Sequence, residues 1–395
     1  MSNKIRVAVR GMGCLSALGL DVESCMKNML AGVRKLNPPQ RFSTAHEIQY
    51  PVFEITDTFK KAESKNNQDL TMTAQMAIAA VYQALEDAQI DKSALEKKRV
   101  GVCMGTTVGS ALNNDQFYID YRDQKQPGMA PIKRFLTSNP AAAVAREFNL
   151  SGPVQTIVNA CASGTDAIGM GASWIKAGLC DLVIAGGTDE LCKTTYNGFI
   201  SLMITDNDPC KPFDANRKGL NLGEGAAALI LGPCLVGQDI EPKCFIAGYG
   251  SACDAYHLTT PHPEGIGLKR AIRQALKESQ IDPKNMGFMN AHGTGTTEND
   301  KVESLVLSQI LPDIPFFSTK GYTGHTLGAA GAIEAVFTIY HLNHKTIPKS
   351  IGFSQPDLSF TRFPITENTQ VSCTSAMSES VAFGGNNSVL VFSEN

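Results

Sequence analysis

Three residues of this chain have side chains suited to acyl chemistry, and each lies in a glycine-rich turn that follows an apolar, strand-like run. They are Cys161 in the turn 158–164, His292 in the turn 289–296 and His325 in the turn 318–328. A thiol can form a thioester, and two imidazoles can stabilise the negative charge that develops on a second thioester beside it. The three turns therefore predict carbon–carbon bond formation on an acyl group held by a cysteine.

The composition excludes several other classes of protein. The chain has 395 residues, a hydrophobic fraction of 43% and a formal net charge of only -3, so we expect no nucleic-acid partner. Its eleven cysteines form no CxxC pair, which favours reduced thiols and a cytoplasmic location. There is no signal-type start and no apolar run long enough for a membrane span. His341 and His344 have one-turn spacing but no acidic or cysteine partner, so we expect no metal site.

A faint internal repeat is the strongest sequence evidence on the fold, because its matches occur in the same order in both halves. Strands that alternate with helices predict an α/β protein with β-α-β units, a mostly parallel sheet in each half and shared helices between the two sheets. The predicted units are residues 1–238, with Cys161, and residues 239–395, with both histidines. We expect the insertion at 112–139 in the first unit to form an oligomer or partner surface. The matched pairs are 9–13 with 246–250, 83–91 with 274–282, 100–106 with 287–294, the helix after Cys161 with the helix after His325, and 222–231 with 383–392.

Cys161 precedes a small-residue helix that ends near Gly178, so its thiol is predicted to lie at the positive end of the helix dipole. Such a position lowers a thiol pKa and favours the nucleophilic thiolate. A lone cysteine at a strand end is more often core filling, and a lone histidine is more often a satisfied core residue. Three such residues in similar turns favour a catalytic site instead. Lys320 lies in the same turn as His325 and is expected beside Glu303, so we predict that it acts on the site through its charge. The hydroxyls of Thr294 and Thr296 are predicted to line the route to Cys161.

At these residues the sequence closely resembles the β-ketoacyl-[acyl-carrier-protein] synthases, the elongating condensing enzymes of the thiolase superfamily. The resemblance spans essentially the whole chain, and several separate motifs occur in the family's order. It implies a thiolase-like fold, with duplicated βαβαβαββ halves in a five-layer α-β-α-β-α arrangement. The most specific motifs are 159–164 (NACASG), 210–214 (CKPFD), 223–226 (GEGA), 254–257 (DAYH), 290–294 (NAHGT) and 320–325 (KGYTGH).

The resemblance also implies a reaction and a role for each site residue. Cys161 would accept an acyl group from the phosphopantetheine of an acyl carrier protein, and no separate cofactor is implied. His292 and His325 would stabilise the enolate formed when malonyl-carrier protein loses carbon dioxide. The condensation product would be a β-ketoacyl-carrier protein, and the enzyme would be a dimer. The other implied roles are positioning of the histidines by Lys320 and Glu303, an oxyanion hole from the N–H groups of Cys161 and Phe383, a gate at Phe383, pantetheine contacts from Thr294, Thr296 and Thr259, and an acyl pocket lined by Val108, Phe199 and Met203.

Two regions depart from the family pattern. The gate has Ala382 where a glycine is expected and Asn386 where a threonine is expected, which puts the motion of the gate in question. The stretch 63–69 is poorer in lysine and arginine than the carrier-docking surface of many relatives. The hypothesis at this point is that four cations of the insertion compensate: Arg122, Lys125, Lys133 and Arg134.

Two other functions stay open on the sequence. One is a non-catalytic, chain-length-setting partner subunit in a ketosynthase heterodimer, although such partners generally lack the cysteine nucleophile. The other is a thiolase-like enzyme that acts on coenzyme A thioesters, although that group normally has a second cysteine in place of one histidine. The sequence also leaves open the acyl chain length, the choice between fatty acid and polyketide or polyene synthesis, and the choice between homodimer and heterodimer.

Overall fold

The computed structural model describes residues 5–67, 69–107, 113–234 and 241–394. Its strands form a ten-stranded mixed sheet in the order β3-β2-β4-β5-β1-β6-β12-β11-β7-β8, and a separate pair, β9 and β10. The strands are β1 (Val7–Ser16), β2 (Val100–Gly105), β3 (Val154–Ile157), β4 (Leu182–Asp189), β5 (Gly225–Pro233), β6 (Cys244–Cys253), β7 (Met289–Asn290), β8 (Phe316–Phe317), β9 (Thr346–Ile347), β10 (Thr369–Gln370), β11 (Ser375–Ala382) and β12 (Asn386–Ser393).

The strand order itself repeats. The first half runs β3-β2-β4-β5-β1 and the second runs β8-β7-β11-β12-β6, with the same sequence of parallel and antiparallel pairings. The two halves join where three residues of β1, Val7 to Val9, pair with β6. The predicted duplication is therefore confirmed in the fold. The predicted boundary at 238 lies outside the described residues, and the division into two units stays a prediction.

The expectation of a mostly parallel sheet is wrong for the inner strands. Within each half, two pairings are parallel and the two nearest the centre of the sheet are antiparallel. The connection between β11 and β12 shows why, because only three residues, Phe383–Gly385, separate these strands. So short a connection can join antiparallel neighbours but cannot make a parallel crossover.

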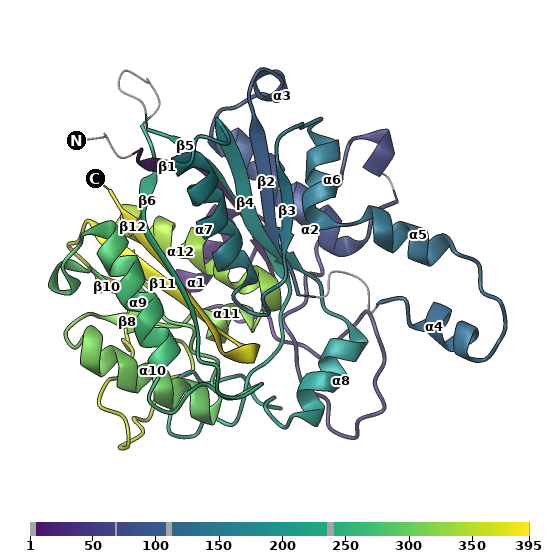
Figure 1. Cartoon of the computed structure of the whole chain (residues 1–395). Helices are drawn as coiled ribbons and strands as arrows, with labels where there is room; N and C mark the ends of the chain where they lie inside the picture. The colour runs from purple at the N-terminus through teal and green to yellow at the C-terminus, as the bar shows by residue number, and fades with distance from the viewer. Residues whose placement is uncertain (1–4, 68, 108–112, 235–240, 395) are drawn as a thin grey trace.

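The helices cover these strands in layers (Figure 1). Helix α2 packs on β1 and β5, α9 packs on β6 and β12, and α7 and α12 lie between the two halves, where they contact strands of both halves and each other. This is the predicted α-β-α-β-α arrangement. The helices are α1 (Val22–Leu30), α2 (Met72–Asp87), α3 (Lys92–Leu95), α4 (Asp115–Arg122), α5 (Ala130–Thr137), α6 (Pro140–Glu147), α7 (Ser163–Lys176), α8 (Lys193–Ser201), α9 (Ile266–Ser279), α10 (Thr297–Ile310), α11 (Lys320–Thr323) and α12 (Ala330–His344).

Glycines allow the two central helices to approach closely. A Cβ atom on Gly164 of α7 would lie 2.8 Å from the backbone nitrogen of Ala332, and one on Gly331 of α12 would collide with the Thr165 hydroxyl. Any larger side chain would push the helices apart. Since the turns that carry Cys161 and His325 lead into these helices, the contact sets the spacing between the thiol and one imidazole.

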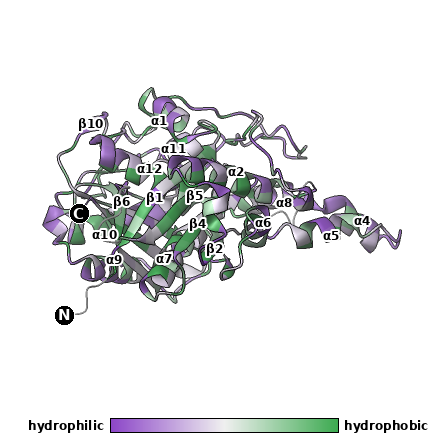
Figure 2. Ribbon diagram, turned by 90° about the horizontal axis from the view of Figure 1, so that it is seen from above, coloured by the Kyte–Doolittle hydropathy of each residue, from purple (hydrophilic) through white to green (hydrophobic). Residues whose placement is uncertain are grey.

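The insertion in the first half forms an arm that projects from the body of the protein (Figures 1 and 2). Its two helices, α4 and α5, bury no residue, and they expose apolar side chains such as Tyr121 and Leu136. Residue 112 of the predicted insertion lies outside the described residues. Among the residues that the structure describes, no helix is long and apolar enough to cross a membrane.

Candidate active site

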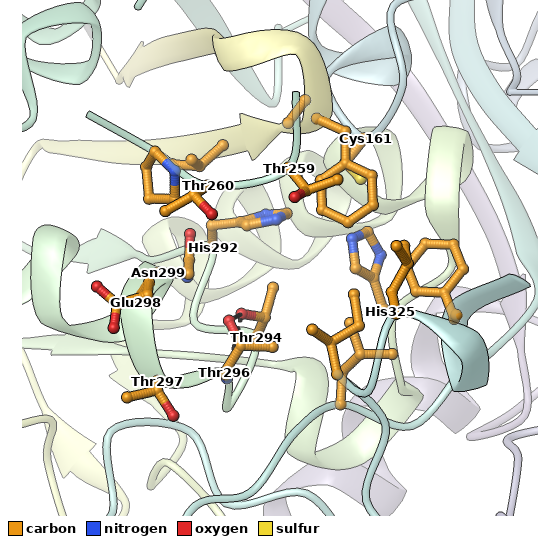
Figure 3. A pocket seen from close by; sticks show the side chains of 18 of the residues that line it. Cys161, Thr259, Thr260, His292, Thr294, Thr296, Thr297, Glu298, Asn299 and His325 are labelled. Carbon is orange, nitrogen blue, oxygen red and sulfur yellow. Dashed lines mark hydrogen bonds between the residues drawn. The ribbon is translucent and has the colours of Figure 1, made fainter. Parts of the chain in front are cut away.

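The structure brings the three predicted chemical groups together (Figure 3). The Cys161 thiol and one ring nitrogen from each of His292 and His325 all lie within 4.8 Å of one another. The two imidazole rings meet edge to face, with centroids 5.1 Å apart and planes at 84°. All three residues are buried, and they line a pocket of about 200 Å³. Cysteine and histidine are also zinc ligands, and the absence of a metal from this site stays a prediction.

The Cys161 turn holds its thiol in place through strained backbone. Ala160 has a φ of +46°, in the left-handed region that a residue with a side chain rarely adopts. The Ser163 hydroxyl secures the turn by donating to the Ala160 carbonyl and accepting from the Asn159 N–H. Helix α7 begins at Ser163, two residues after the cysteine. Strain of this kind persists only where the surroundings impose it, and it is frequent at functional sites.

Burial controls the resting state of the thiol. Loss of hydration raises the pKa of Cys161 to about 11, although the Lys320 charge and the hydrogen bond donated by the Phe383 N–H to the sulfur both act in the opposite direction. The prediction of a lowered thiol pKa is therefore wrong, because desolvation outweighs the favourable charges. The neutral thiol predominates at rest, and it must lose its proton as the substrate reacts.

This raised pKa predicts how Cys161 responds to alkylation. With a pKa of about 11, only about one thiol in 10⁴ is ionised at pH 7, so the rate of reaction with iodoacetamide should rise about tenfold per pH unit from pH 7 to 9.5. Peptide mass mapping would follow Cys161 separately from the other cysteines, with a free cysteine peptide as the control. A rate that levels off below pH 8 would show that the thiolate is already formed in the resting protein.

Both histidines are held neutral in one tautomer. Burial and the Lys320 charge hold the pKa of His292 and of His325 well below its usual value. Nδ1 of His292 faces the Lys320 ammonium at 2.9 Å, and Nδ1 of His325 accepts from the Leu327 N–H at 3.1 Å. Because both Nδ1 atoms act as acceptors, the proton of each neutral ring must be on Nε2. The site therefore offers two N–H donors.

Lys320 is held by a residue that the sequence analysis missed. Its ammonium lies 2.5 Å from a carboxylate oxygen of Glu334 on α12, and both side chains are buried. The signal in the sequence was a single acidic residue in an otherwise apolar helical run, 330–339. A charge in such a position needs a buried partner, and Lys320 is that partner.

Glu303 lies near this pair and contacts the backbone of the turn that carries His292. Its carboxylate accepts from the Gly293 N–H at 2.7 Å and from the Asn299 amide. A second buried acid, Glu379, lies close enough for its pKa to respond to Glu303: burial and the Glu303 charge raise the pKa of Glu379 well above its usual value. Lys320 is near enough to Glu303 for its charge to act on that carboxylate, as expected, while its ion pair is with Glu334. The roles of Lys320 and Glu303 in positioning the histidines stay predictions.

Five of the six residues predicted to bind substrate line the pocket: Thr294, Thr296, Thr259, Phe199 and Met203. The Thr294 and Thr296 hydroxyls are 2.8 Å apart, on the wall that leads to the thiol. Val108 lies outside the described residues. The four cations proposed for carrier docking, Arg122, Lys125, Lys133 and Arg134, are on the arm and not among the residues that line this pocket.

The predicted gate borders the same pocket. The Phe383 ring stacks on Phe199, with centroids 5.6 Å apart and planes at 14°. Ala382 has a φ of -121°, an extended conformation open to any residue, so alanine causes no strain in this state. The left-handed positions are Gly384 and Gly385, with φ of +83° and +77°. Backbone freedom in the gate therefore depends on these two glycines, and its motion stays a prediction.

Comparison with known proteins agrees with this geometry. The model for the beta-ketoacyl synthase N-terminal domain matches residues 4–234, and the model for the C-terminal domain matches residues 243–354. The 3-oxoacyl-[acyl-carrier-protein] synthase 2 of Staphylococcus aureus is 33% identical and covers 99% of both chains. A putative mitochondrial 3-oxoacyl-[acyl-carrier-protein] synthase of Schizosaccharomyces pombe is 31% identical and covers 98% of both.

Solved structures give the same result. The ishigamide ketosynthase/chain length factor is similar with a TM-score of 0.92 and 28% identity, and covers 99% of both chains. A beta-ketoacyl synthase from Burkholderia phymatum has a TM-score of 0.90 and 27% identity, and covers 98% of this chain and 99% of the other. With both domain models matched over most of the sequence, and with full-length relatives above 30% identity, this chain belongs to the beta-ketoacyl synthase family.

Proposed function

We propose that the protein is a β-ketoacyl-[acyl-carrier-protein] synthase, which condenses an acyl group on Cys161 with malonyl-carrier protein and releases carbon dioxide. The observation that carries the proposal is the meeting of one thiol with a ring nitrogen from each of two neutral imidazoles inside 4.8 Å, where both imidazoles use Nδ1 as an acceptor and so keep an N–H donor at Nε2. A thiol supplies the covalent acyl carrier. Two neutral donors side by side suit an oxyanion that forms in a buried site, where hydrogen bonds are strong.

The first half of the reaction loads the enzyme. The Cys161 sulfur attacks the carbonyl carbon of the acyl-carrier thioester, a new S–C bond forms, and the carrier leaves with the proton as a free thiol. The N–H groups of Phe383, which contacts the sulfur at rest, and of Cys161 would donate to the carbonyl oxygen as it gains charge. Since the resting thiol is neutral, proton transfer accompanies the attack.

The second half forms the carbon–carbon bond. The bond between the malonyl α-carbon and its free carboxylate breaks, carbon dioxide leaves, and the electron pair becomes an enolate whose oxygen accepts from His292 and His325 Nε2. The enolate carbon then attacks the acyl carbon on Cys161, the S–C bond breaks, and the released Cys161 thiolate takes up a proton from solvent to return to the neutral resting thiol. The product is a β-ketoacyl-carrier protein. The steps balance without a redox or metal cofactor, and the phosphopantetheine arm arrives with the substrate.

The three threonines that line the pocket support delivery of the acyl group by a phosphopantetheine arm. Thr259, Thr294 and Thr296 supply hydroxyls along the pocket above a cysteine that is only 5% exposed, so a carrier can reach it only through a long, narrow group. Phosphopantetheine has amides that pair with hydroxyls. Phe199 beside the gate adds an apolar surface for the acyl chain.

Assembly into a dimer is part of the proposal. β3 is a sheet edge, and Val154 on it and Val158 just after it are exposed. An uncovered apolar edge is suited to pairing with another strand. A homodimer is favoured because Cys161 and both histidines are present in this chain, so it needs no catalytic partner. A heterodimer with a homologous subunit is the alternative. The eleven free cysteines fit a reducing cytoplasm.

Two measurements test this function. Incubation with an acyl-carrier thioester should add the acyl mass to the peptide that contains Cys161, and addition of malonyl-carrier protein should then release carbon dioxide and a β-ketoacyl product. A silent, chain-length-setting subunit would give no acyl peptide. A thiolase-like enzyme would load from acyl-coenzyme A and condense without carbon dioxide release.

A further inference from the structure

Three exposed apolar side chains lie on the segments that line the outer part of the pocket. Met203 is 87% exposed, Leu258 is 79% exposed and Leu202 is 46% exposed. Leu202 and Met203 line the pocket, and Leu258 precedes the lining residues Thr259 and Thr260. The Leu258 carbonyl accepts from the Gly384 N–H, which fixes it beside the gate. We call these three residues the mouth rim.

Met203 is an unusual residue to find in this position. It follows the C-terminal end of α8 with a φ of +57°, a left-handed conformation that glycine or asparagine adopts at lower cost. Its side chain gains almost no burial in return, because it is nearly fully exposed. An apolar side chain that is exposed and also strains the backbone contributes little to folding. Such a combination indicates a contact made with another molecule.

Charge around the entrance is nearly balanced. The pocket lining includes one cation, Lys218, and one exposed anion, Glu298. Among the described residues, three of the four cations proposed for docking have an acidic neighbour, Lys133 being the exception: Arg122 pairs with Asp123 at 3.0 Å and Lys125 pairs with Asp120 at 3.2 Å. Arg134 lies 3.9 Å from Asp69. An acidic partner would therefore gain little from electrostatic steering toward this face.

We propose that the acyl carrier protein docks on the mouth rim through apolar contacts, with only a minor contribution from basic residues. The inference rests on the proposed function, since it names the surface that this function's substrate carrier uses. The occupant follows from continuity with the site: Met203 and Thr259 line the pocket that contains Cys161, and Met203 is exposed, so a protein whose prosthetic arm reaches Cys161 must come close to these segments. Buried apolar anchors then carry most of the binding energy.

The double variant M203N/L258Q tests the rim, because asparagine keeps the left-handed backbone while both apolar side chains are lost. The matched control is L179Q, a leucine that is 54% exposed just beyond the C-terminal end of α7. Acylation of Cys161 is measured with octanoyl-carrier protein and with octanoyl-N-acetylcysteamine, a thioester without a protein. We expect the ratio of the two kcat/KM values to fall about tenfold in M203N/L258Q and to stay unchanged in L179Q.

The dependence of the carrier KM on salt concentration distinguishes apolar from electrostatic docking. Between 50 and 500 mM sodium chloride, KM for the carrier should change less than about threefold, because screening acts on charges alone. A steep rise in KM with salt would overturn the proposal. The proposal would also be overturned if the quadruple charge reversal R122E/K125E/K133E/R134E raised KM for the carrier while M203N/L258Q left that KM unchanged. If the small thioester still acylates Cys161 but the rim variants and the salt dependence contradict apolar docking, the docking proposal fails and the proposed function stands. If neither thioester acylates Cys161, both the docking proposal and the proposed function fail.

Discussion

Replacing Cys161 with alanine should abolish condensation while malonyl-carrier protein is still decarboxylated. The variant has no sulfur to hold an acyl group, so product formation should fall by at least about 10⁴-fold, as for loss of a nucleophile in other acyl-transfer enzymes. The two Nε2–H donors do not depend on the thiol, since Lys320 and the Leu327 N–H fix their tautomers. Release of labelled carbon dioxide and of β-ketoacyl product, measured in the same reaction, gives the two rates.

Cysteine-to-serine replacement is the matched control for this experiment. C161S keeps the shape and a weaker nucleophile, so slow acylation without efficient condensation is expected. Circular dichroism and the melting temperature should stay near those of the parent protein in both variants, because Cys161 belongs to a small apolar cluster with Ala162 and Ala382 and not to one of the large cores. If C161A lost decarboxylation as completely as condensation, the histidines could not be the independent enolate site described above.

The sequence predicted the parts of the site that are fixed by local chain signals. Cys161, His292 and His325 each follow a strand and lie in a glycine-rich turn, so their order in the repeat was enough to place them together. The same repeat predicted two halves with shared helices between them, and the family resemblance implied the five-layer arrangement. Both predictions depend on patterns within a few residues, and these survive when the chain folds.

Other features depend on contacts between distant segments, and the sequence does not encode them locally. Glu334 is fourteen residues from Lys320 and becomes its partner only when α12 packs between the two halves. The raised pKa of Cys161 has the same origin, because burial is set by the whole fold rather than by the helix that follows the thiol. The same holds for the mouth rim, where segments around 203 and 258 meet only at the pocket entrance.

Replacing Lys320 with methionine should slow decarboxylation by about 10²-fold or more. The variant removes the donor to His292 Nδ1, so the ring is free to move its proton to that nitrogen and lose the Nε2–H donor. It also leaves Glu334 buried without its cation, which costs about 3 to 5 kcal/mol for a broken buried pair. Steady-state carbon dioxide release and chemical denaturation measure the two effects.

The double variant K320M/E334Q separates positioning from stability. Glutamine removes the uncompensated charge of Glu334, so most of the lost stability should return while decarboxylation stays slow. The pH profile adds a second readout. Lys320 lowers the pKa of His292, so removal of its charge raises that pKa, and the loss of activity on acidification should begin at a higher pH than in the parent protein. Recovery of full activity along with stability in K320M/E334Q would mean that Lys320 only supports the fold, since a positioning role requires the ammonium itself beside Nδ1.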